Sequence, residues 1–243
     1  MFAKLFVFCA LFFLYGCNSP TVTYEIGIDP SWYPLNFQER QKNILGFSTE
    51  LLTQIALEEK ISISVLNTNW DTLLEGLKEK KYQAILTSLY PYNFNEQFYS
   101  FSNVFLDIGP VLVAPIASED LSLKSLSGKA VGALEQSPEI LLLEKDPTIF
   151  IRTYPSVPDA LNDLVSENIQ AALLPVLTTS AYIDHLYFRK LKIASKPLNE
   201  DGLRLVTLKD ASPELIKKFN KELEKMKENG EYEKLLSKWA LTN

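Results

Sequence analysis

Two hydrophobic periodicities alternate along the chain from residue 24 onward. Apolar residues occupy every second position in Tyr24–Ile28 and Ile61–Val65, which is typical of strands with one buried face. Between them, the apolar residues of 51–56 recur at helical spacing. The alternation continues through strands expected at 83–89, 129–134, 149–154 and 170–174, and helices near 73–77, from 137 and at 159–165. Strand–helix–strand order predicts an α/β fold with mostly parallel sheets and ligands at the carboxyl ends of strands.

Several helix boundaries have local signals. Ser137–Glu139 and Ser212–Glu214 both read Ser-Pro-Glu, which favours an N-cap, a proline at the first helical position and an acid in the first turn. Ser156–Asp159 has the form of a capping box. Asn229-Gly230 is expected to end the helix that contains Lys217–Lys227, a stretch whose interleaved Lys and Glu residues indicate a solvated face.

The amino-terminal segment has the features of an export signal. Leu5–Tyr15 is an apolar run that follows Lys4, and it is shorter than the about 20 residues of a transmembrane helix. Leu14-Tyr15-Gly16-Cys17 resembles a bacterial lipobox, which implies cleavage before Cys17 and acylation of its sulfur. The alternative is an ordinary secretory signal with an incidental cysteine. We expect a signal peptide at 1–16, a tether at 17–23, and a periplasmic protein that is lipid-anchored to a bacterial membrane.

Charge and cysteine content restrict the partners and the covalent chemistry. The chain has a formal charge of −6, and cleavage would also remove Lys4 and Cys9. This balance argues against nucleic acid as a partner and against a basic membrane-binding face. Cys17 would be the only cysteine left, which excludes a disulfide within the processed chain. The one histidine, His185, is expected to be structural, and a zinc site is not expected.

Seven short motifs occur in an order that resembles one protein family, from residue 24 to 240: Asp29–Phe37, Gly46–Ser48, Asn69–Leu77, Gln83–Ile85, Phe101-Ser102, Gly128–Gly132 and Asn220–Trp239. Their order is similar to that in the extracellular solute-binding proteins of polar-amino-acid ABC importers. The resemblance implies a type II periplasmic-binding-protein-like fold with two hinge crossovers. Lobe 1 would comprise 22–108 plus 204–243, and lobe 2 would comprise 109–203.

The same resemblance implies how such a protein works. A small-molecule ligand would bind between the lobes, which close on it. The partners would be an ABC permease and an ATPase. A monomer without cofactors and without enzymatic activity is expected.

The resemblance also indicates which residues should line the cleft, and where this chain departs from the family. Trp32 and Trp70 fall at two stacking positions, with core packing as the alternative. Asn95 stands where the family has the arginine that binds the ligand's α-carboxylate. Pro175 stands where it has the aspartate that binds the α-ammonium, and Gln136–Pro138 replaces a Gly-Thr-Thr loop.

A mostly neutral site, rich in aromatic rings and hydroxyl groups, is therefore expected. Its candidate residues are Asp29, Trp32, Trp70, Thr87, Ser88, Tyr90, Tyr92, Asn95, Ser137 and Pro175. Because unpaired buried charges are costly, such a site favours a neutral or weakly cationic molecule, a modified amino acid or a short peptide over an ordinary amino acid. Asp29 could instead hold a turn, and Ser137 could instead cap a helix.

Two other functions compete with solute capture for an importer. An enzyme on the same scaffold would use a cleft carboxylate, for which Asp29 and Glu135 are the candidates, and would show a raised pKa there. A sensory or adhesive lipoprotein would keep the fold and fill the cleft with its own side chains.

Overall fold

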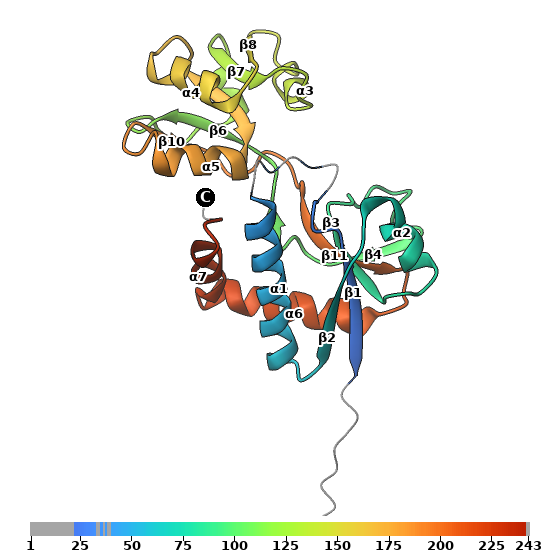
Figure 1. The fold of residues 1–243 in the computed structure, drawn as a ribbon. Coiled ribbons are helices and arrows are strands. Elements are labelled where there is room, and N and C mark those ends of the chain that lie inside the picture. Colours follow the sequence, from blue (N-terminus) through green and yellow to red (C-terminus); the bar gives the residue numbers. More distant parts are fainter. Residues whose placement is uncertain (1–21, 33–34, 36, 38–39, 242–243) are drawn as a thin grey trace, which may run out of the picture.

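The computed structural model describes residues 22–32, 35, 37 and 40–241, and its strands form two sheets (Figure 1). The predicted signal peptide and Cys17 lie outside these residues. The first sheet has the strand order β2-β1-β3-β11-β4, with β5 also paired to β11, and the second has the order β10-β6-β9-β7-β8. The strands are β1 (Thr23–Ile28), β2 (Ser62–Asn67), β3 (Ala84–Thr87), β4 (Tyr99–Phe101), β5 (Leu106–Asp107), β6 (Pro110–Pro115), β7 (Ala130–Leu134), β8 (Phe150–Tyr154), β9 (Ala171–Pro175), β10 (Leu191–Ile193) and β11 (Gly202–Leu208).

Each sheet has its own helices, and we call each sheet with its helices a lobe (Figure 1). Lobe 1 contains the first sheet with α1 (Gln41–Glu58), α2 (Trp70–Lys78), α6 (Pro213–Glu228) and α7 (Glu231–Lys238). Lobe 2 contains the second sheet with the 3-10 helix η1 (Leu123–Leu126), α3 (Ile140–Leu143), α4 (Val157–Val165) and α5 (Val176–His185). The chain crosses to lobe 2 between β5 and β6 and returns between β10 and β11. The predicted two-lobed α/β fold is confirmed.

The prediction of mostly parallel sheets is wrong, because both sheets are mixed. β1 runs parallel to β2 and β3, whereas β11 runs antiparallel to β3, β4 and β5. In lobe 2, β7 runs parallel to β8 and β9, whereas β6 runs antiparallel to β9 and β10. The chain enters β6 and β11 from the hinge, where the parallel strands end. β6 and β11 begin at the hinge, so β6 runs antiparallel to β9 and β11 runs antiparallel to β3.

The predicted helix starts are confirmed at two of three positions. Ser156 caps α4 by accepting a hydrogen bond from the N–H of Asp159, and α6 begins at the proline after Ser212. The helix expected from Ser137 is wrong: α3 begins at Ile140, and no side chain caps it. Here Gln136 has a positive φ of 57°, and the N–H of Ser137 donates to the carbonyl of Leu134. The chain therefore makes a turn before the helix starts.

The carboxyl-terminal residues hold α1 in place. A Cβ atom on Gly46 would lie 2.2 Å from the ring of Trp239, so only glycine permits this approach. The Nε1–H of Trp239 donates to Glu50 at 2.9 Å, and Asn43 donates to the carbonyl oxygen of Trp239 at 2.8 Å. Gly230, with φ of 77°, makes the predicted break that directs α7 back onto α1.

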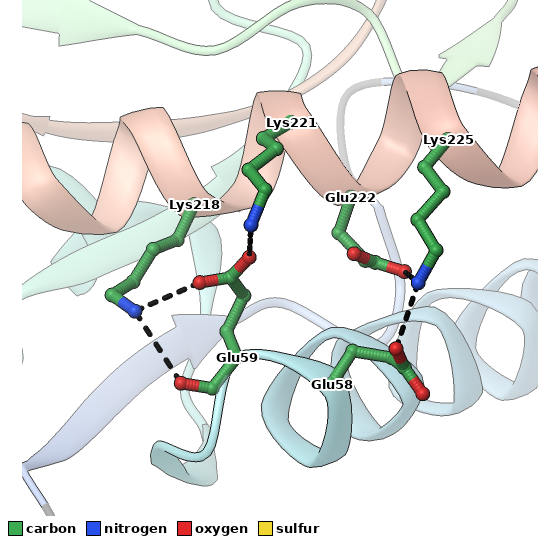
Figure 2. Close-up of polar contacts among 6 residues, drawn as sticks. All are labelled: Glu58, Glu59, Lys218, Lys221, Glu222 and Lys225. Carbon is green, nitrogen blue, oxygen red and sulfur yellow. Dashed lines mark hydrogen bonds and ion pairs between the residues drawn. The ribbon is translucent and has the colours of Figure 1, made fainter.

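Ion pairs join α6 to the end of α1, as Figure 2 shows. Glu59 accepts hydrogen bonds from Lys218 at 2.8 Å and from Lys221 at 2.6 Å, and these bonds lower the pKa of its carboxyl group. Lys225 bridges Glu58 and Glu222 at 2.7 and 3.0 Å. Glu222 is only 2% exposed. Lys221 and Lys225 are exposed, as expected for a solvated face, but the burial of Glu222 and the ion pairs to Glu58 and Glu59 show that part of this face contacts the end of α1.

Candidate ligand-binding site

The carboxyl ends of the parallel strands meet at one edge of each sheet. In lobe 1, Ile28 at the end of β1 pairs with Asn67 of β2 and with Leu86 of β3. In lobe 2, Leu134 at the end of β7 pairs with Tyr154 of β8, and the end of β9 lies on the other side of β7. The connections that start at these edges carry the predicted ligand-binding residues, which is the usual arrangement in α/β proteins.

Both edges lie next to the hinge. Arg204, near the start of β11, pairs with Thr87 at the end of β3. Pro110, at the start of β6, pairs with Pro175 at the end of β9. The hinge strands therefore leave each sheet at its carboxyl edge, and predicted residues from the two lobes lie on either side of the crossovers.

Asp29 holds the connection that follows β1. One of its carboxylate oxygens accepts hydrogen bonds from the N–H and the hydroxyl group of Ser31, at 2.8 and 2.7 Å. Its carbonyl oxygen accepts the N–H of Trp32 at 3.0 Å. This oxygen arrangement is typical of an aspartate that stabilises a turn. A contact between Asp29 and a ligand stays a prediction.

Trp32 is buried in the main apolar core. It is 4% exposed and belongs to the same cluster as Ile28, Phe37 and Phe47. Its φ of 58° lies in the left-handed region, where a non-glycine residue is unusual, and its indole N–H is buried without a hydrogen-bond partner. Backbone strain and unpaired buried donors concentrate at functional sites. Stacking of Trp32 on a ligand stays a prediction, and it requires the indole to become uncovered.

Trp70 is half-buried at the first position of α2 and packs against the smaller core cluster of lobe 1, beside Leu73 and Leu77. Asn69 caps this helix by accepting the N–H of Thr72 at 3.1 Å. The cap places Trp70 directly after the carboxyl edge of β2, and stacking of Trp70 on a ligand stays a prediction.

The segment after β3 forms a ladder of aromatic rings. The centroids of Tyr90 and Tyr92 are 4.6 Å apart, and those of Tyr92 and Phe94 are 5.5 Å apart. The side chain of Asn95 donates to the carbonyl oxygen of Tyr90 at 2.8 Å, and its N–H donates to that of Tyr92 at 2.7 Å. Asn95 therefore braces this ladder. Tyr92 and Phe94 are exposed, and Phe94 was not among the predicted residues.

Thr87 and Ser88 lie between β3 and this aromatic ladder. Thr87 is buried, and its hydroxyl oxygen accepts the N–H of Leu89 at 3.2 Å. Ser88 is half-buried. Both predicted residues are therefore at the carboxyl edge of lobe 1.

Arg204 lies at the same edge of lobe 1, paired with Thr87, and was not among the predicted residues. It is 5% exposed, and its guanidinium carbon lies 5.6 Å from the centroid of the Tyr90 ring. A signal was available, because Arg204 is the only charged residue in the buried strand β11. The motifs that indicate the candidate residues do not include this position, so Arg204 is absent from the predicted site.

Lobe 2 contributes the loop after β7 and the end of β9. Ser137 has a buried hydroxyl group without a hydrogen-bond partner, and Pro175 ends β9 and precedes α5. Glu135, the candidate acid of an enzyme, is exposed. Ser137 therefore does not cap a helix, and its hydroxyl group remains available for a polar contact.

Among the described residues, five buried side-chain polar atoms have no hydrogen-bond partner. Those of Ser48 and Thr179 lie within α1 and α5, whereas the indole N–H of Trp32, one terminal nitrogen of Arg40 and the hydroxyl group of Ser137 lie in the connections that follow β1 and β7. Burial lowers the pKa of Arg40, and the opposing effect comes from Asp184 on α5 of lobe 2. Buried donors are nearly always satisfied in native proteins, so these groups point to a missing partner at the interface of the lobes.

Within the described residues, no helix combines the length and the apolar character needed to cross a bilayer. The same part of the chain holds no group of three His, Cys, Asp or Glu side chains that could bind a metal ion.

The family model for bacterial extracellular solute-binding proteins, family 3, matches residues 24–242. The chain is 29% identical over 244 residues to the arginine-binding extracellular protein ArtP of Bacillus subtilis, covering 95% of this chain and 94% of that protein. It is 25% identical over 227 residues to the lysine/arginine/ornithine-binding periplasmic protein of Escherichia coli, covering 89% and 87%.

Solved structures share the fold. The unliganded, open L-cystine solute receptor of Neisseria gonorrhoeae matches with a TM-score of 0.71 at 17% identity, covering 90% of this chain and 93% of that chain. Substrate binding domain 2 of Lactococcus lactis GlnP, in open conformation, matches with a TM-score of 0.67 at 20% identity, covering 90% and 96%. At these identities the match shows a common fold of type II periplasmic binding proteins.

Proposed function

Because the chain belongs to the bacterial extracellular solute-binding proteins of family 3, we propose that it is the lipid-anchored solute-binding component of an ABC importer. The observation that carries the proposal is the pairing of Arg204 with Thr87 and of Pro110 with Pro175, which brings both carboxyl edges to the hinge. A solute bound there would touch both lobes. The relatives include proteins named for binding arginine, lysine, ornithine, histidine or L-cystine, and these support an amino-acid-like solute.

Closure of the lobes would be driven by contacts that exist only in the closed state. The unpaired groups of Trp32 and Arg40 lie on lobe 1, and that of Ser137 lies on lobe 2. A solute that satisfied donors from both sides would bind the closed state better. The permease and the ATPase of the importer would then recognise the closed form.

Attachment through an acylated Cys17 is compatible with this arrangement. β1 starts at the end of lobe 1 that lies away from lobe 2 (Figure 1). An anchor that precedes β1 would hold the molecule by that end and would leave the edges at the hinge accessible to solute.

The bound solute would differ from an ordinary α-amino acid at its amino group. Pro175 has no carboxylate, and as a proline it has no backbone N–H either. An amino group without a carboxylate partner would lose a charge-assisted hydrogen bond, which is among the stronger contacts in binding sites. A solute whose amino group is modified or part of a peptide bond avoids this loss.

Isothermal titration calorimetry tests this proposal with arginine, lysine, histidine and cystine, each as the free amino acid and as the Nα-acetyl derivative. We expect at least one of these amino acids to bind, and we expect its Nα-acetyl derivative to bind with the same or a higher affinity. Acetylation removes a charge for which lobe 2 supplies no partner at Pro175.

Three results would contradict the proposal. Binding of free amino acids that is lost on acetylation would mean that the ammonium group is held elsewhere. No binding by any compound would argue against an amino-acid-like solute, and chemical conversion of a compound during the titration would instead indicate an enzyme.

A further inference from the structure

The guanidinium group of Arg204 is buried without an anionic partner in contact. Among the described residues, no ion pair to Arg204 is formed. Its hydrogen bonds go to two carbonyl oxygens of the hinge, at 2.9 Å to Glu200 and 3.4 Å to Gly202. A guanidinium group has more N–H donors than these two acceptors use. Arg204 therefore keeps the capacity to bind an anion.

The surroundings of Arg204 do not neutralise its charge at short range. Burial lowers the pKa of Arg204, and Tyr90, Glu200, Asp201 and Asp107 oppose this shift without forming an ion pair. A buried charge that is not paired is costly for the fold. An anion that paired with the guanidinium group would offset part of this cost.

Arg204 also lies at the right place to meet a ligand. Its strand position is opposite Thr87, and its side chain stacks near the ring of Tyr90, so it shares the carboxyl edge of lobe 1 with two predicted site residues. It also lines a cavity of about 510 Å³, whose lining includes Lys196 together with the acids Asp107 and Glu200 and includes none of the predicted site residues. A cavity of this size is in the range of small-molecule sites.

We propose that Arg204 binds the carboxylate group of the solute, from strand β11, while Asn95 braces the aromatic ladder instead. This inference rests on the proposed function and specifies one of its contacts. The carboxylate would occupy the free donors of the guanidinium group, in the planar, bidentate manner that arginine favours. It would lie near the hydroxyl groups of Thr87 and Ser88, which could donate to its other lone pairs.

The inference changes the expected class of solute. The unpaired guanidinium group would be positively charged before binding and would be neutralised by the carboxylate of the solute, so the site would select a molecule that has a carboxylate group but no free α-ammonium group. An Nα-substituted amino acid and the carboxyl end of a short peptide both have this chemistry.

The test compares each bound compound of the calorimetric panel with its carboxamide, in wild type and in Arg204→Gln. In wild type the carboxylate form is expected to bind more tightly than the carboxamide. Arg204→Gln should weaken the carboxylate form by about tenfold or more and should change the carboxamide little, because only the charged form uses the guanidinium group. Arg204→Lys keeps the charge but not the planar set of donors, so its affinity for the carboxylate form should lie between those of wild type and Arg204→Gln.

Two further variants separate binding from folding. Glu200→Gln removes a nearby negative charge but keeps the carbonyl group that accepts from Arg204, and it should tighten carboxylate binding. Arg189→Gln removes an arginine of lobe 2 that lies on an exposed turn, and it should leave all affinities unchanged.

Equal weakening of carboxylate and carboxamide by Arg204→Gln, or no weakening of either, would overturn the inference while leaving the proposed function in place. If Arg204→Gln unfolds below the assay temperature, the other two variants test the inference. Weaker carboxylate binding by Arg204→Lys and tighter carboxylate binding by Glu200→Gln would support it, and the opposite changes would overturn it. Failure of wild type to bind any compound would overturn the proposed function and this inference with it.

Discussion

Replacement of Trp32 by alanine is expected to lower the free energy of unfolding by about 3–5 kcal/mol, because it removes a large buried side chain from a packed core. The indole is 4% exposed and packs in the cluster that contains Phe37 and Phe47. In a chain of this length the loss corresponds to a decrease in Tm of roughly 10 °C. Denaturant titration followed by circular dichroism gives the free energy directly.

Two matched variants separate volume from hydrogen bonding at this position. Trp32→Phe keeps most of the apolar volume and removes the N–H group that has no partner, so its cost is expected to be much smaller. Trp70→Ala truncates a half-buried indole and should cost less than Trp32→Ala. Wild-type stability in Trp32→Ala, together with a loss of solute binding, would show that this indole faces the ligand and does not support the core.

Replacement of Cys17 by serine is expected to release nearly all of the protein from membranes without changing the stability of the folded lobes. Cys17 would be the only acylation site of the processed chain. Acyl chains contribute about 0.8 kcal/mol per buried CH₂ group, and stable attachment takes more than one chain or a basic patch. The acidic surface of this protein does not supply such a patch.

Fractionation of a bacterial host that expresses each form measures this effect. Wild type should sediment with the membranes, and the serine variant should be recovered in the soluble extracytoplasmic fraction. Serine-variant protein that still sediments would mean that the apolar run Leu5–Tyr15 remains attached as an uncleaved anchor.

Many elements of the fold could be predicted from local periodicity, but the hinge strands β6 and β11, helix α5 and the strand directions were not predicted. Apolar alternation at Tyr24–Ile28 and the break at Asn229-Gly230 correspond to β1 and to the junction of α6 and α7. The directions of β6 and β11 depend on where the chain crosses the hinge, and this is a property of the tertiary arrangement. Similarly, Glu222 is buried because α1 packs against α6, and its own helix pattern does not reveal this.

The candidate site could be predicted by position more readily than by role. The residues after β1, β3 and β7 lie at the carboxyl edges, as the strand–helix order implies. The bracing by Asn95 is local and depends on the turn that Tyr90–Asn95 forms, whereas whether a side chain such as Trp32 is covered depends on neighbours far along the chain. Arg204 was missed for the same reason, since it reaches the edge of β3 from a strand more than a hundred residues later.

The central claim is that a carboxylate-bearing solute binds at the hinge edges and closes the two lobes. Small-angle X-ray scattering measures closure directly, with and without the compound that calorimetry shows to bind most tightly. We expect the radius of gyration to decrease on addition of that compound in wild type, and to stay unchanged with its carboxamide at the same concentration. An unchanged radius of gyration at saturating solute would contradict the claim.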